Sequence, residues 1–236
     1  MSGGYKMSET KMRQQALQLI QSMIDDHIIS TQDLLRFQTD TINIYEPEYI
    51  RNEMEKWYIN YGIETILKRK FTLDLPHFTK AEIQEAYESG DMIICLPKGI
   101  TRKQLSELFH MNTWAATNEF VMDKIEIEDF WFQTKISTVP EYLDKTASEI
   151  KAIFVRENKL AMSLERYMVF VERMRSIYRK LPDQKYKTWL LNSKYENSAV
   201  LIAGQAPNQD FSVHAWMNNF HSPMVGGRYV IIPDHI

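Results

Sequence analysis

Residues 199–236 have the sequence AVLIAGQAPNQDFSVHAWMNNFHSPMVGGRYVIIPDHI, and this stretch decides the fold class. Three runs rich in apolar and β-branched residues lie at 198–203, 211–217 and 228–232. Alternation of apolar and polar residues is typical of half-buried strands. Pro207-Asn208 and Gly226-Gly227 lie between the runs, and such pairs favour turns. The pattern predicts three strands that form an antiparallel meander.

The preceding part of the chain carries both helix and strand signals. Residues 92–96 are a short apolar run between turn residues, which predicts a buried strand. Residues 120–136 alternate in polarity and predict another strand. Residues 189–191 predict a short turn of helix. A Ser or Thr cap marks the helix starts, in three cases with Glu or Gln three residues later; these caps are Thr79, Thr101, Thr146 and Ser163. The sequence therefore predicts an α+β fold.

Amphipathic helices dominate the first part of the chain. Apolar residues recur at spacings of three and four from residue 8 to 29, and Pro47 lies where a later helix begins. A charged run at 68–70 is followed by Pro76. We therefore expect a helical N-terminal region at 1–75 and an α+β core at 76–236. The Met and aromatic residues of these helices are types that are over-used at binding surfaces; the alternative is that they cover the core.

Composition limits the class of protein. The 236 residues are 44% hydrophobic and 12% aromatic, which is enough for a substantial core. The formal net charge of −3 gives no global basicity for nucleic acid or acidic membranes. Cys95 is the only cysteine, which excludes an internal disulfide and fits a reducing compartment. The N-terminus lacks a secretory apolar region, and no apolar run is long enough to span a bilayer. We expect a cytoplasmic protein with no cofactor and no membrane association.

Residues 166–194 carry eight basic residues against two acidic ones. Tyr178, Tyr186 and Trp189 are interleaved with them, as in surfaces that stack on bases. The stretch indicates a nucleic-acid site, a docking site for an acidic protein, or a solvated helix face whose long side chains cover apolar surface. The candidate binding residues are Arg166, Arg173, Arg179, Lys180, Lys185 and Lys187.

Residues 102–120 fit half of a helix-turn-helix. Leu105 and Leu108 follow the pattern of its first helix. His110 stands at the turn position where Gly is usual, and residues 114–122 contain no Arg or Lys for DNA contacts. We therefore expect a capped helix here rather than a DNA-reading motif.

Metal and nucleophile motifs are missing from the sequence. The six histidines form no H-x-x-x-H or H-E-x-x-H pair, so no metal site is predicted. Cys95 lies in an apolar run, where a thiol is usually an inert core residue. G-x-S-x-G, Walker and dinucleotide-binding patterns are absent.

The C-terminal stretch contains the one cluster that fits catalysis. Asp210, His214 and His221 are close in sequence, and Ser212 would share a strand face with His214. A base beside a hydroxyl is the arrangement of a hydrolase. The alternative is the ordinary alternation of an edge strand.

Three groups of short motifs resemble uncharacterised bacterial and phage-borne proteins of unknown function. They are Gly90-Asp91-Met92-Ile93-Ile94 with the Pro97 turn, Trp131-Phe132 before Val139-Pro140, and Gly226-Gly227-Arg228-Tyr229. The resemblance covers residues 75–236 and implies no activity and no functional residues.

The leading hypothesis is a non-enzymatic protein-interaction or scaffold protein that docks onto another protein or onto a second copy of itself. One alternative is a nucleic-acid-binding regulator that uses the basic residues of 166–194. The other is a hydrolase-like enzyme at the C-terminal sheet.

Overall fold

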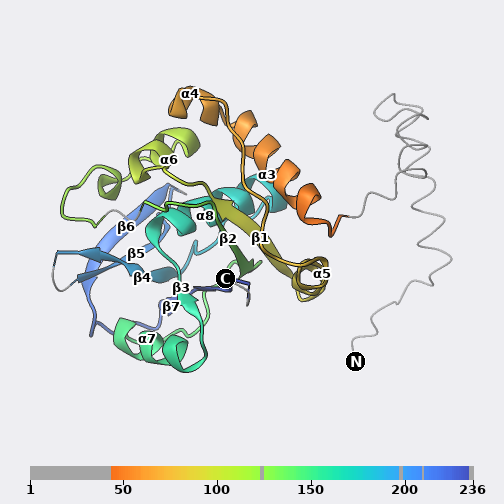
Figure 1. Cartoon of the computed structure of the whole chain (residues 1–236). Coiled ribbons are helices and arrows are strands. Elements are labelled where there is room, and N and C mark those ends of the chain that lie inside the picture. Colours follow the sequence, from red (N-terminus) through yellow and green to blue (C-terminus); the bar gives the residue numbers. More distant parts are fainter. Residues whose placement is uncertain (1–43, 123–124, 197–198, 209, 234–236) are drawn as a thin grey trace, which may run out of the picture. The chain divides into compact units, whose positions relative to one another are not determined.

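The computed structural model describes residues 44–122, 125–196, 199–208 and 210–233, and its fold is α+β, as predicted (Figure 1). Tyr45–Ile236 forms one compact unit. The helices predicted before residue 44 lie outside the described residues. No helix in the described part of the chain is long and apolar enough to cross a membrane.

The predicted helix caps are present where the structure describes them. Thr79, Thr101 and Thr146 each form a complete capping box with the Glu or Gln three residues later, and the Ser163 hydroxyl accepts from the Arg166 amide. Each pair satisfies backbone N–H groups that a helix start leaves free. The helices are α3 (Pro47–Asn60), α4 (Ile63–Leu67), α5 (Lys80–Glu88), α6 (Arg102–Phe109), α7 (Ala147–Arg156) and α8 (Leu164–Tyr178), with a 3-10 turn, η1 (Trp114–Ala116).

The apolar stripe of α3 packs into the main core. Ile50, Met54, Trp57 and Tyr58 are all buried. The Tyr58 hydroxyl donates to the carbonyl oxygen of Cys95 at 2.7 Å, so α3 is tied to the first strand of the core. The Met and aromatic residues of α3 that suggested a binding surface are therefore mostly core residues, and α3 belongs to the same compact unit as the sheets.

A two-stranded antiparallel sheet joins β1 (Asp91–Leu96) to β2 (Phe130–Lys135). The strand predicted at 92–96 is confirmed. The strand predicted at 120–136 starts only at Phe130, so that prediction is wrong for its first half. Asp129 provides a physical reason, because its buried carboxylate accepts from the amides of Asp74 and Lys98 at 2.6 and 2.8 Å and fixes a bend before β2.

A four-stranded sheet has the order β6-β5-β4-β7. Its strands are β4 (Lys187–Tyr195), β5 (Ala199–Gln205), β6 (Phe211–Met217) and β7 (Val225–Gly227). The antiparallel pairing of β5 with β6 is confirmed. The helical turn predicted at 189–191 is wrong, because these residues lie in β4, where Trp189 and Leu190 pair with β5.

The last predicted strand does not continue the meander. β7 pairs in parallel with β4, and β8 (Tyr229–Val230) pairs with β3 (Leu160–Ala161) in a separate sheet. The turn predicted at Gly226-Gly227 is therefore a strand. Arg228 separates β7 from β8, and its guanidinium is buried against Asp183, which holds this segment in the interior.

A bulge interrupts β4. Leu190 pairs with Leu201, but the next pair is Lys194 with Val200, so residues 191–193 are extra. The start of α8 holds the bulge in place, because the Ser193 hydroxyl accepts a hydrogen bond from the amide of Leu164 at 2.7 Å. Bulges re-aim side chains, and this one brings Lys194 onto the face of the sheet that Val200 occupies.

Two apolar clusters lie on opposite faces of the four-stranded sheet. The larger contains the buried residues of α3, α6, α8 and β1-β2. The smaller lies between α7 and the sheet and is built by Ala147, Ile150, Phe154, Trp189, Ile202 and Val225. Figure 1 shows the sheet between α7 on one side and α8 and α6 on the other.

Candidate functional site

The C-terminal candidates do not form one site. The His214 ring lies 2.9 Å from the Ser212 hydroxyl on β6. His221 instead contacts Asp144, which precedes α7, with its Nε2 3.2 Å from Oδ1. Asp210 accepts from the side chain of Asn208 and lines a pocket beside α8. The three side chains are exposed and have separate partners. Among the described residues, the Ser212–His214 pair therefore has no acid that orients the ring.

The protonation of His214 can be predicted from its surroundings. Partial burial, and then the positive charge of Lys187, lower the pKa of His214 below its ordinary value of 6.5. Because the folded chain favours the neutral ring, the stability it contributes is present above the ordinary pKa and is lost as the pH falls. We expect an NMR titration to give a midpoint below 6.5, and Lys187→Gln to shift it upward. A midpoint above 6.5 would show that the imidazolium is stabilised instead.

The six basic candidates are divided between interior and surface. Arg166 is buried, with its Nη2 2.6 Å from Glu126 and its guanidinium carbon 3.6 Å from the centre of the Phe130 ring. Arg173 lies over Trp57 at 5.2 Å, and Lys187 donates to the carbonyl oxygen of Gln205. The residues that stay exposed are Arg179, Lys180 and Lys185, at and after the end of α8. A nucleic-acid site on this stretch would therefore depend on half of the predicted set.

The segment after α6 is not a recognition helix. His110 closes α6 with a positive φ of 54°, and the amide of Met111 bonds back to Ser106 at 3.0 Å. This is a left-handed helix end of the kind that usually contains Gly. Only the short 3-10 turn η1 follows, so the expected capped helix is present and the DNA-reading second helix is not formed.

Cys95 is buried in β1, and burial raises the pKa of its thiol, so the thiolate needed for nucleophilic attack is disfavoured. Within the residues that the structure describes, no three His, Cys, Asp or Glu side chains converge as metal ligands.

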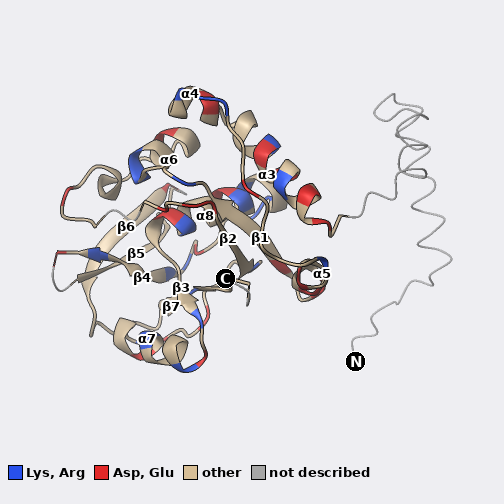
Figure 2. Cartoon of the chain, in the orientation of Figure 1, with Lys and Arg blue, Asp and Glu red and all other residues tan. Residues whose placement is uncertain are grey.

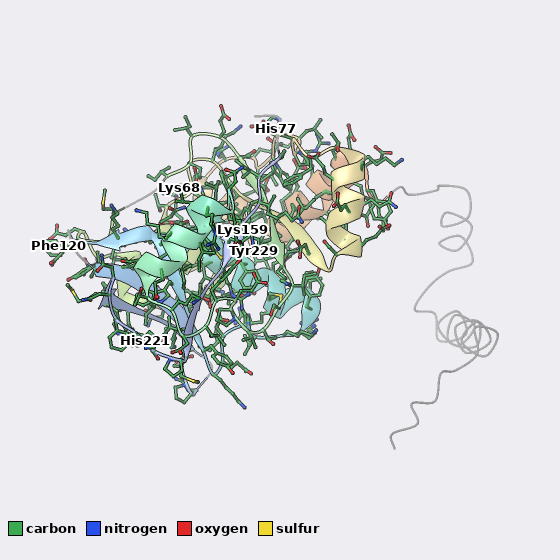
Figure 3. All side chains as sticks on the ribbon, turned by 90° about the horizontal axis from the view of Figure 1, so that it is seen from below. Lys68, His77, Phe120, Lys159, His221 and Tyr229 are labelled. Carbon is green, nitrogen blue, oxygen red and sulfur yellow. The ribbon has the colours of Figure 1, made fainter. Side chains whose placement is uncertain are left out.

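A polar cluster that the sequence did not indicate joins Lys159 to Tyr142 and Glu157. Lys159 Nζ donates to the Tyr142 hydroxyl and to Glu157, both at 2.9 Å, and lies 3.9 Å from the centre of the Tyr229 ring (Figure 3). Burial alone lowers the pKa of Lys159, but the two hydrogen bonds outweigh it and raise the pKa. A lysine held in its charged form is a poor nucleophile, so the cluster fastens the segment before β3 rather than providing catalysis.

A small pocket of about 70 Å³ lies between α8 and the turn into β6. Glu172, buried on α8, accepts from the Tyr61 hydroxyl and from Arg175, whose Nη2 is 2.7 Å away. Burial, and then Glu172, raise the pKa of Tyr61, so its hydroxyl stays a donor. Gln205 Nε2 lines the pocket without a hydrogen-bond partner among the described protein atoms. The Glu172 carboxylate is thus already bound by two donors within the protein.

A group of exposed apolar side chains lies at one end of the four-stranded sheet, and we call it the apolar edge. The centre of the Tyr195 ring lies 5.5 Å from that of Trp114 and 6.4 Å from that of Phe120. Met217 is on the same sheet face, because Tyr195 pairs with Ala199 and Ala199 pairs with Met217. The exposed fractions are 42% for Trp114, 53% for Phe120, 64% for Met122 and 54% for Met217. Figure 3 shows Phe120 at the outer margin of the molecule, far from His77 and Tyr229.

The adjoining strand β6 is an edge of its sheet. Its sequence, FSVHAWM, contains no Lys, Arg, Asp, Glu or Pro, and the ribbon of β5 and β6 is tan throughout in Figure 2. Proteins usually protect an edge strand with charges, Pro or a bulge, because its unpaired backbone groups can pair with another chain. β6 has none of these protections.

Comparison with known proteins gives no matching family model, no matching curated protein and no matching solved structure.

Proposed function

We propose that this chain is a non-enzymatic protein-interaction protein that binds an extended segment of a partner protein along β6 and over the apolar edge. The observation that carries the proposal is the coincidence of an edge strand that lacks charges, Pro and a bulge with four exposed large apolar side chains. Strand addition uses backbone hydrogen bonds for affinity and neighbouring side-chain contacts for specificity.

The hydrogen-bonding direction of β6 supports this mode. The carbonyl oxygen of Val213 accepts from the Trp114 indole at 2.7 Å, so it points away from β5. Backbone groups alternate along an antiparallel strand, so the N–H and C=O of Ala215 also point outward. Trp114 thus covers one outward group and leaves the following residues for an added strand.

The polar clusters support a binding role over catalysis. Lys159 is held in its charged form by Tyr142 and Glu157, and Glu172 is bound by Tyr61 and Arg175. Cys95 is fully buried. Lys159 and Glu172 are thus bound to other side chains of the protein and Cys95 is inaccessible, whereas the large side chains of the apolar edge face solvent.

Two variants test the proposal with linear peptides selected from a displayed random library on the full chain. Phe120→Ser with Met122→Ser should weaken a selected peptide at least about tenfold, because two anchors of the apolar edge are lost. Ala215→Pro should do the same by removing an outward N–H, while thermal stability changes little because the bonds to β5 remain. Fluorescence anisotropy gives the dissociation constants.

Val155→Ser is the matched control, since Val155 is 74% exposed on α7, away from β6. It should leave peptide affinity unchanged. Equal binding by the control, the double variant and Ala215→Pro would contradict the proposal. Concentration-dependent dimerisation in sedimentation velocity that Ala215→Pro abolishes would instead identify a second copy of the chain as the occupant.

A further inference from the structure

A pocket of about 180 Å³ lies between α7 and the face of the sheet that carries the smaller apolar cluster. α7 contributes Ser148 and Lys151, β4 contributes Lys194, and Asn218 follows β6; the apolar walls are Ala147, Leu191, Ala199 and Val200. Its lining thus combines two cations, a hydroxyl and a carboxamide with an apolar surface.

The charge of this α7 pocket is unbalanced. Among the residues that the structure describes, no Asp or Glu lines it. Neither Lys151 nor Lys194 has an ion pair within the described part of the chain, and Glu149 on the same helix is used in the Thr146 capping box. The first turn of α7 is already capped, because the amides of Ser148 and Glu149 donate to the Asn218 carbonyl oxygen and to the Thr146 hydroxyl. The positive charge of the pocket therefore comes from its two lysines. Two lysines whose positive charge has no ion-pair partner, beside an apolar wall, indicate a binding site for an anion with an apolar part.

Lys194 reaches the pocket because of the bulge in β4. If the register of Trp189 and Leu190 continued unshifted, Leu191 would stand opposite Val200, and this part of the sheet face would be apolar under α7. The bulge puts Lys194 there instead, and Ser193 and Asn192 hold it through hydrogen bonds to Leu164 and Ala161. Bulges are frequent next to functional sites, where they re-aim a side chain.

We infer that the α7 pocket binds a small organic anion, with its carboxylate or phosphate group between Lys151 and Lys194 and a short apolar body against Leu191 and Val200. Both head groups share the chemistry that two lysines, a hydroxyl and an amide recognise. The site is independent of the strand-binding surface at β6, so either assignment can fail without the other.

Isothermal titration of the full chain with acetate, butyrate, hexanoate, butyl phosphate, inorganic phosphate and butylammonium tests this. Affinity should rise roughly fourfold for each methylene that enters the pocket, so hexanoate should bind more tightly than acetate. Comparing butyl phosphate with butyrate decides between the two head groups. Butylammonium should not bind. Absence of saturable binding by hexanoate and butyl phosphate at millimolar concentration would overturn the inference.

The variant pair Lys151→Gln with Lys194→Gln should weaken the tightest anion at least about tenfold, because both charge-assisted contacts are lost. Lys180→Gln with Lys185→Gln removes the same charge from exposed positions elsewhere and should leave affinity unchanged. Equal losses in the two pairs would show a net-charge effect and no site. A melting curve of each variant checks the fold, and NMR shifts of the Leu191 methyl groups on titration provide a readout at the pocket itself.

Discussion

Asp183→Asn is expected to lower the free energy of unfolding by about 3–5 kcal/mol, because it leaves the buried guanidinium of Arg228 without its counter-charge. Arg228 bonds Asp183 through Nε at 3.1 Å and Nη2 at 2.6 Å. The hydroxyls of Tyr167 and Thr188 each donate to the same carboxylate at 2.6 Å. Asp183 is fully buried and Arg228 is 5% exposed.

The electrostatics of the pair give the direction of the effect. Burial alone lowers the pKa of Arg228, but the Asp183 carboxylate outweighs it and raises the pKa. Burial, and then Asp183, raise the pKa of Tyr167, so its hydroxyl remains a donor. Asn keeps the shape of the side chain and tolerates the positive φ of 56° at this position, so the substitution removes charge with little added backbone strain.

Denaturant unfolding monitored by tryptophan fluorescence measures the loss. Asp210→Asn at an exposed position should change stability by less than about 0.5 kcal/mol. The double variant Asp183→Asn with Arg228→Met should be more stable than Asp183→Asn alone, since the uncompensated charge is then gone. A single-variant loss below about 1 kcal/mol would show that Arg228 finds another acceptor.

Local sequence signals predicted local structure well. Thr79, Thr101 and Thr146 with their partners three residues later are complete signals within one turn, and all three capping boxes formed. Ser163 also caps α8 as predicted. The assignment of 189–191 to a helix failed because a three-residue apolar run fits either structure, and β4 is decided by its pairing with β5, which is a tertiary interaction.

The basic stretch shows why charge counts mislead when burial is unknown. α8 is buried continuously from its first residue to Glu172, so Glu165, Arg166 and Glu172 lie in the interior with the apolar residues. The unbroken apolar run at 167–171 is a sequence signal for this burial, since a helix that is apolar all round is usually interior. On that signal Arg166 is expected in a buried ion pair and not on the surface.

The surface features were less accessible from sequence. Trp114, Phe120 and Met122 are ordinary core residue types, but in the folded chain their side chains are exposed. Likewise, Lys194 lines the α7 pocket only because three residues bulge out of β4. The pattern of a single sequence shows neither which strand lies at the edge of a sheet nor where the register between two strands shifts.

Gly226 and Gly227 were predicted as a turn because paired glycines usually supply positive φ. In β7 they have a different role. Gly227 exchanges two backbone hydrogen bonds with Glu141, at 2.7 and 3.0 Å, so two segments approach closely. Glycine within a strand often marks such an approach, where a side chain would not fit.

Gly226→Ala is therefore expected to destabilise the protein by about 3 kcal/mol, the upper end of the cost of overpacking. An added Cβ would lie 2.3 Å from the carbonyl oxygen of Glu141, a backbone atom that cannot move without disturbing the bonds to Gly227.

Gly227→Ala should cost less, because its Cβ would meet a side-chain methyl of Ile150 at 2.7 Å. Gly90→Ala is the conformational control: its φ of 78° is strained for Ala, but the surrounding space is open, so about 1–2 kcal/mol is expected. Denaturant midpoints of the three variants should rank Gly226→Ala as the least stable. If Gly90→Ala were the least stable instead, positive φ and not close packing would be the stronger constraint on glycine in this fold.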